Sequence, residues 1–339
     1  MESVRRVTQA DIAARAGCHR ATVSLVFKNH PSIPAETKER VLQISKEMGY
    51  SPDPMLSALA AYRSRLQPHG YQGTLAWLTR GNVWSNITLF KNCFLGASQR
   101  AKDSGYDLEV FNLQAPGMTA KRMASILRAR NVPGVLVCPQ EHLEADLVFA
   151  WECFSAVKFG YSLLKPDLHI VAATHYRAIV KTMRNLYRLG YRRIGYAVWP
   201  EIDEKADFNC LAGYVVEEFK RGKSVPVPPF AGELSPPNIL RWVKKNRLDA
   251  IVTADFAFPS LLKGTGLNVP GDIGVACFAL PSAEGFVSGI SENSIRIGEI
   301  AVDTVVAMVN RGERGLPQVP YRILVEGQWF AGKSLRPQK

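Results

Sequence analysis

Apolar residues recur at helical spacing in three short segments of the first 50 residues. The first segment, ADIAARA, follows Thr8 and stops at Gly17; Asp11, three positions after Thr8, completes the pattern of a capping box. The third segment begins near Pro34, which suits a first helical turn, and ends at Gly49. With the segment between them, they predict an all-α helix-turn-helix bundle.

The second segment, residues 17–29, has one apolar side, formed by Val23, Val26 and Phe27. The opposite side carries Arg20, Ala21, Ser24, Leu25 and Lys28. A solvated helix face is usually lined with glutamates and lysines, so this mixture of a guanidinium, a hydroxyl, an amine and small or apolar groups indicates a contact surface. A partly exposed helix of an ordinary bundle is the alternative that this segment alone leaves open.

The pattern changes to alternating strands and amphipathic helices from Gly73 onward. A first run contains the strand patterns TLAWLT, YDLEVFN and GVLVCPQ; a second run, starting after residue 167, contains VAAT, RRIGYAVW, DAIVTAD and IGVACFA. Two runs of βαβ units predict an α/β core with two doubly wound parallel sheets. Ligands of such sheets bind beyond the carboxyl ends of the strands.

Between these regions lies an apolar segment, residues 54–62, that is too short to be a stable helix in isolation. Asp53 followed by Pro54 is a helix-start pair. The segment therefore predicts a helix that forms only against a partner.

The chain has 339 residues, 47% hydrophobic residues and a formal net charge of +12. A basic excess suits a polyanionic partner. However, residues 1–66 carry ten basic and six acidic residues, a net +4, so the remainder carries +8. Because the excess is not concentrated in the bundle, nucleic-acid binding must be argued from the placement of residues.

The sequence contains no pattern typical of a metal site, a cofactor site or a catalytic site. The six cysteines are scattered through apolar segments, which favours reduced core residues over disulfides. His142, His169 and His175 share no ligand spacing and are interpreted as surface or structural residues. The first residues, MESVRRVTQAD, lack the apolar region of a signal peptide, so we expect a cytoplasmic protein. Because no catalytic pattern is present, we expect that it is not an enzyme.

The first 60 residues resemble the DNA-binding head of the lactose/galactose-repressor (LacI/GalR) family of bacterial transcriptional regulators. The matching elements are V-T-x-x-D-I-A-x-x-A-G, T-V-S, T-x-x-x-V and G-Y-x-P-x-x-x-x-x-L-A, in register without a gap. The rest of the chain resembles, more loosely, that family's two-lobed core of periplasmic-binding-protein type. The resemblance implies a helix-turn-helix domain (1–51), a hinge helix with linker (52–70) and a core (71–339), with lobe 1 at about 71–165 and 295–323 and lobe 2 at about 166–294 and 324–339.

The resemblance also implies which residues contact DNA. Arg20 and Ala21 fall on the specificity positions of the recognition helix, where a guanidinium can donate two hydrogen bonds to guanine. Leu59 falls on the leucine that wedges into the minor groove, although Met55, Leu56 and Leu59 could instead pack on the core. The residues expected at DNA are Thr8, Gln9, His19, Arg20, Ala21, Thr22, Ser24, Leu25, Lys28, Thr37, Tyr50, Asp53, Leu56 and Leu59.

Three of these positions depart from the family pattern. His19 replaces a serine, Leu25 an arginine, and Asp53 the asparagine that opens the hinge helix. These departures affect which operator sequence is read rather than DNA binding itself.

The ligand core departs further, because both polar anchors that hold sugars or purines in the family are replaced. Cys210 stands in place of an arginine, and the turn that carries an aspartate reads Cys277-Phe278-Ala279-Leu280. We expect simple sugars and purines to bind poorly. The residues expected at an effector are Trp84, Asn86, Phe208, Cys210, Asp255, Phe256 and Phe278, although filling the core is the commoner role of such aromatics.

The sequence thus predicts a homodimeric transcriptional repressor of double-stranded operator DNA, with no membrane partner. It leaves two alternatives open for control, namely a small-molecule effector of unknown identity or no effector. A small-molecule-binding protein of transport-receptor type is the alternative, but it has no use for residues 1–66.

Overall fold

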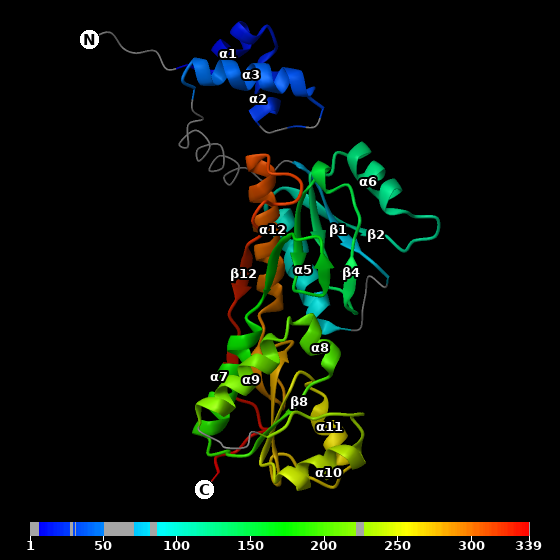
Figure 1. The fold of residues 1–339 in the computed structure, drawn as a ribbon, viewed down its shortest axis with the longest axis vertical. Coiled ribbons are helices and arrows are strands. Elements are labelled where there is room, and N and C mark those ends of the chain that lie inside the picture. Colours follow the sequence, from blue (N-terminus) through cyan, green and yellow to red (C-terminus); the bar gives the residue numbers. More distant parts are fainter. Residues whose placement is uncertain are drawn as a thin grey trace, which may run out of the picture.

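A three-helix head precedes an α/β core in the computed structural model, which describes residues 7–27, 30, 32–50, 71–81, 87–221 and 227–338 (Figure 1). The head consists of α1 (Gln9–Ala16), α2 (Arg20–Phe27) and α3 (Ala35–Glu47). Thr8 forms the predicted capping box with Asp11, and Gly17 ends α1 in the left-handed conformation, with φ of 64°. The helix-turn-helix prediction is confirmed.

The first core sheet has six parallel strands in the order β12-β7-β5-β3-β1-β2. Their bounds are β12 (Arg322–Val325), β7 (His169–Ala173), β5 (Ser155–Phe159), β3 (Gly134–Val137), β1 (Gly73–Thr79) and β2 (Tyr106–Asn112). Strands buried on both faces read as continuous apolar runs, which is why TLAWLT and GVLV were recognisable in the sequence. A separate short pair joins β4 (Glu144–Asp146) to β6 (Leu163–Lys165).

The second core sheet has five strands in the order β13-β11-β10-β9-β8. Their bounds are β13 (Gln328–Phe330), β11 (Ser288–Ser291), β10 (Gly274–Leu280), β9 (Ala250–Thr253) and β8 (Ile194–Ala197). All pair in parallel except β13, which is antiparallel to β11. The helices of this lobe are α7 (His175–Arg188), α8 (Pro200–Lys205), α9 (Asn209–Lys220), α10 (Pro236–Asn246) and α11 (Phe258–Lys263).

The first lobe is covered by α5 (Thr88–Asp103), α6 (Ala120–Ala129) and α12 (Ser294–Arg311). Helices α5 and α12 lie side by side (Figure 1). Gly96 and Gly298 make this approach feasible, because a Cβ on either glycine would overlap a backbone carbonyl oxygen of the facing helix. Helix α12 therefore joins the first lobe although it follows the second lobe in sequence.

The chain crosses between the lobes three times, after β7, before α12 and between β12 and β13. The expected boundary at 165/166 is wrong, because β7, the strand containing VAA, pairs with β5 and β12 in the first sheet. The crossings are hydrogen-bonded to one another: the Thr174 amide donates to the Val325 carbonyl at 3.1 Å, and Asn293 Nδ2 donates to the Glu326 carbonyl at 2.8 Å. The three crossings therefore form one hydrogen-bonded connection between the lobes.

Candidate nucleic-acid interface and interlobe cavity

The N-terminal end of α2 presents its side chains to solvent while its other face is buried. Val23 and Val26 are packed in the head core, whereas His19, Arg20 and Ala21 are exposed. Thr22, Ser24 and Leu25 are half-buried along the edge of the helix. The structure thus places the predicted base-reading positions on the open side of a rigidly packed helix.

His19 caps α2, the predicted recognition helix. Its Nδ1 accepts a hydrogen bond from the Ala21 amide at 3.2 Å, and its carbonyl accepts from the Thr22 amide at 2.8 Å. A side-chain acceptor on the second helical amide is the usual function of a serine cap. The replacement of the family's serine by histidine therefore preserves the helix start, and the imidazole itself is exposed at the predicted DNA surface.

The predicted phosphate contacts Thr8, Thr37 and Tyr50 lie at the edges of the bundle. Thr8 is exposed at the start of α1, where its hydroxyl donates to Asp11 Oδ2 at 2.7 Å. Thr37 is half-buried in the first turn of α3, and the Tyr50 ring packs on Phe27 with 5.3 Å between centroids. Helix N-termini and their hydroxyls suit phosphate oxygens.

The structure describes only one of the five remaining residues that were predicted to contact DNA. Gln9 is half-buried as the first residue of α1. Four others lie outside the described residues, namely Lys28, Asp53, Leu56 and Leu59.

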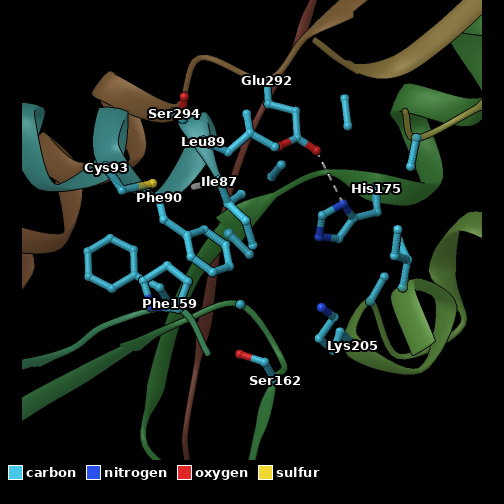
Figure 2. Close-up of a pocket in the computed structure, with 18 of the residues that line it drawn as sticks. Ile87, Leu89, Phe90, Cys93, Phe159, Ser162, His175, Lys205, Glu292 and Ser294 are labelled. Atoms are coloured by element: carbon cyan, nitrogen blue, oxygen red, sulfur yellow. Dashed lines mark ion pairs between the residues drawn. The ribbon is translucent and has the colours of Figure 1, made fainter. Parts of the chain in front are cut away.

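A cavity of about 480 Å³ lies between the lobes, at the carboxyl ends of strands from both sheets (Figure 2). Residues following β3, β5, β7, β8, β9, β10 and β11 line it, together with the first turns of α5, α7 and α12. This is the location that the sheet topology predicts for a ligand. Its volume lies within the range of small-molecule sites, about 300–1,000 Å³.

Four of the seven predicted effector residues line this cavity: Cys210, Asp255, Phe256 and Phe278. Phe208 does not line it. It precedes α9 in the left-handed conformation, with φ of 54°, and its side chain is 54% exposed to solvent. Trp84 and Asn86 lie outside the described residues.

The cavity also contains ionisable groups that the sequence did not single out. His175 Nδ1 lies 3.7 Å from Glu292 Oε1 on one side, as Figure 2 shows. Burial lowers the pKa of His175 to about 4 and raises the pKa of Glu292 to about 7. Lys205 stands at the mouth, where its ammonium donates to the Glu141 carbonyl at 2.5 Å. His175 is thus a cavity residue rather than a surface or purely structural one.

All six cysteines are free, and four of them are buried. Burial raises the pKa of the Cys138 thiol to about 11 and that of Cys277 to about 12, so both are protonated, unreactive core residues. Within the described residues, no helix is long and apolar enough to cross a membrane.

The head matches a known family. Residues 8–53 fit the family described as bacterial regulatory proteins, lacI family. The helix-turn-helix head is thus similar to the head of that family and is that of a DNA-binding transcriptional regulator, as the sequence predicted.

Sequence relatives align with different shares of this chain. The transcriptional regulator PtxS of Pseudomonas plecoglossicida is 27% identical over 190 residues, which are 56% of this chain and 53% of PtxS. The regulator MalR of Streptococcus pneumoniae is 23% identical over 332 residues, 94% of this chain and 97% of MalR. These relatives are named as regulators, not as enzymes.

Solved structures share the fold of this chain. The transcriptional regulator CelR in complex with cellobiose has a TM-score of 0.57 at 20% identity, covering 97% of this chain and 100% of that one. The lac repressor dimer bound to operator and an anti-inducer has a TM-score of 0.55 at 18% identity, covering 98% and 100%. The two-lobed core is therefore confirmed as a fold.

Proposed function

We propose that this protein is a cytoplasmic repressor of the LacI family that binds a pseudo-palindromic operator as a homodimer. The observation that carries the proposal is the start of α2, where Arg20 and Ala21 are exposed beside buried Val23 and Val26. A helix anchored in this way can enter the major groove, with Arg20 donating to guanine O6 and N7. Thr22, Ser24 and the bundle-edge residues would fix its register on phosphates.

We infer dimerisation from the apolar segment 54–62, here called the hinge segment, and from the geometry of helix-turn-helix heads on DNA. One recognition helix reads a half-site of only a few base pairs, so specificity requires a second head about one helical turn away, roughly 34–36 Å. The apolar segment around Leu59 would become a stable helix when it packs against its twin over the minor groove. The solved lac repressor, a dimer on its operator, is a fold-level precedent.

The cavity supports control by a small molecule. A ligand that binds one relative arrangement of the lobes more tightly than another shifts the population toward it, and this differential affinity is the whole mechanism. The three hydrogen-bonded crossings are the connection through which such a shift would reach the hinge segment.

Selection of bound sequences from a random DNA pool tests the proposal. We expect a two-fold-symmetric consensus whose binding weakens steeply with salt, since each neutralised phosphate releases a counterion. An asymmetric consensus, or no enrichment with the full-length protein, would contradict it.

The rival is a transport-receptor-type binding protein with the same core. It predicts ligand binding without enrichment of any DNA sequence. The capped and packed three-helix head favours the regulator, because such a protein would gain nothing from residues 7–50.

A further inference from the structure

Glu292 is a buried carboxyl group that faces the cavity with no hydrogen-bond donor. The residue follows β11, is 8% exposed and lines the cavity wall, with its carboxyl directed toward His175 (Figure 2). The 3.7 Å between Glu292 and His175 Nδ1 is too long for a hydrogen bond, and no other described residue donates to the carboxyl. Because the carboxyl oxygens open onto the cavity and no described residue donates to them, their donor must come from what occupies the cavity, which points to a ligand.

His175 does not supply the positive charge that the carboxylate lacks. Burial keeps the imidazole neutral at pH 7, since its pKa falls to about 4. The only cause that raises the pKa of Glu292 is burial; no cationic side chain acts to lower it. The pair therefore carries negative charge whenever Glu292 is ionised.

The charges of the cavity lining favour a cation over an anion. Among the described lining residues, the acidic side chains are Asp255 and Glu292, and Lys205 is the one basic side chain that is charged at pH 7. Lys205 is held at the mouth by the Glu141 carbonyl and lies near the carboxylates of Glu141 and Glu201. An anionic ligand reaching Glu292 would meet a like charge in an apolar enclosure.

The opposite wall is apolar and aromatic. Phe90 and Phe159 lie across the cavity from Glu292 and His175 in Figure 2. Phe278 and Ala279, at the carboxyl end of β10, also line the cavity, and Cys210 replaces the other family anchor. The phenylalanine rings and Ala279 offer no hydrogen-bond partner to the hydroxyls of a sugar, and they suit a hydrophobic ring.

We propose that the cavity binds a small organic cation, with an aromatic or aliphatic body against Phe90 and Phe159 and one protonated amino group that donates to Glu292. The inference rests on the proposed role of the cavity as a regulatory ligand site. The neutral imidazole of His175 would accept a second hydrogen of the ammonium. Because the bound ammonium holds Glu292 ionised, the fraction of carboxyl groups protonated at pH 7 gives its proton to solvent.

Three probes of similar shape and different charge test the proposal on the full-length protein by titration calorimetry at pH 7. They are 2-phenylethylamine (cation), 2-phenylethanol (neutral donor) and 3-phenylpropionate (anion), with glucose as a sugar control. A charge-assisted hydrogen bond to a buried carboxylate should make the amine bind about ten- to a hundredfold more tightly than the alcohol. Equal binding of amine and alcohol, or tightest binding of the anion or of glucose, would overturn the proposal.

Two variants test whether Glu292 is responsible for the preference for the amine. Glu292→Gln keeps the size of the side chain and should abolish the preference for the amine, whereas Glu233→Gln, an exposed carboxylate on a loop, should retain it. Retention of the preference in Glu292→Gln would refute the assignment. Should that variant fold poorly, calorimetry of the wild type in two buffers of different ionisation enthalpy gives an independent answer: proton release supports the proposal, and proton uptake or no exchange contradicts it.

These measurements are separable from the proposed DNA function. The unliganded Glu292→Gln protein should still bind the selected operator, measured by fluorescence anisotropy. The separation is made on the wild-type protein. If wild type binds the operator but no amine, the ligand inference fails and the proposed regulator function stands; if it prefers the amine but binds no operator, the regulator function fails and the ligand inference stands.

Discussion

At the residue scale, we expect sequence reading by the head to depend most on the side chain of Arg20. It is exposed at the first position of α2, next to the His19 cap that fixes where the helix begins. Its fork of donors matches guanine in the major groove.

Replacing Arg20 by Ala should cost about 1–3 kcal/mol of operator binding and relax the preference at one base position. Anisotropy on the consensus and on single-base variants measures both effects. Arg15→Ala, which removes an exposed guanidinium from α1, is the control for lost charge alone. If Arg20→Ala weakens every sequence equally, Arg20 contacts phosphate and reads no base.

The buried carboxyl of Glu292 should also be visible in the pH dependence of stability. Its pKa rises from 4.5 to about 7 on folding, so its contribution is fully present below pH 4.5 and is lost as the pH rises through 7. His175 has the opposite sign, because its pKa falls from 6.5 to about 4, and its contribution is lost as the pH falls through this range.

We therefore expect Glu292→Gln to gain stability relative to wild type as the pH is raised from 4.5 to 8. Thermal unfolding at intervals across this range gives the difference. A difference that does not change with pH would mean that the carboxyl is solvated in the folded protein.

At the scale of elements, the contact between α5 and α12 determines how the first lobe is built and how its cavity wall is placed. The first turns of both helices line the cavity, and Gly96 and Gly298 allow the two backbones to touch. No rearrangement of a flexible side chain can make room there, because the atoms that a Cβ would meet belong to the backbone.

Gly298→Ala should lower the free energy of unfolding by roughly 1–3 kcal/mol, the usual cost of overpacking, despite the better helix propensity of alanine. Urea unfolding measures the change, and Asn310→Ala on the exposed side of α12 is the matched control. Unchanged or increased stability of Gly298→Ala would show that the helices can separate freely.

The hinge segment lies outside the described residues, so its role stays a prediction. Leu59→Ala should leave the core folded and weaken specific operator binding, while non-specific binding, which rests on phosphates, changes less. If both affinities fall by the same factor, Leu59 packs on the protein and not between base pairs.

Most elements could be predicted from the sequence, and the exceptions share a physical cause. Buried strands such as β1 and caps such as Thr8 and Gly17 carry a local signal. The lobe to which β7 belongs carries no such signal, since it is determined by pairing with β5 and β12, and a local pattern does not encode which strands pair. Likewise, alignment with the family identified Cys210 and Phe278 at the cavity but misplaced Phe208, whose left-handed backbone turns it outward.

Glu292 and His175 were missed for a related reason. A glutamate is expected at the surface, and only the closure of two lobes around the end of β11 buries this one. The sequence does contain one usable signal, namely the absence of the family's polar anchors, which implies that any ligand must be held by other residues.

At the scale of the whole molecule, the lobes are held together on the cavity side by contacts from α8. Glu201 accepts a hydrogen bond from His142 at 2.7 Å, and Lys205, one turn later, donates to the neighbouring Glu141 carbonyl. Asn92 Nδ2 adds a bond to the Pro281 carbonyl at 3.0 Å. The His142–Glu201 pair is exposed, so its contribution is small, about 0.2–1 kcal/mol.

His142→Ala should therefore speed hydrogen exchange in residues 139–146 and 200–205 by less than about fivefold. Exchange followed by mass spectrometry measures this, and Arg130→Ala, which breaks an exposed ion pair within one lobe, is the control. Equal effects of both variants on these segments would mean that the pair does not hold the lobes together.

The three crossings lie at one edge of each sheet, so a rotation of one lobe about them displaces distant contacts more than nearby ones. In the first sheet β3 stands two strands from β7, and in the second β8 stands three strands from β11, so the contacts of α8 lie roughly 10–14 Å from the pivot. A turn of about 10° about that pivot displaces them by roughly 2 Å, enough to break a hydrogen bond. The strands at the pivot would move by a fraction of that distance, so a small rotation could exchange all contacts at the mouth and leave both sheets intact.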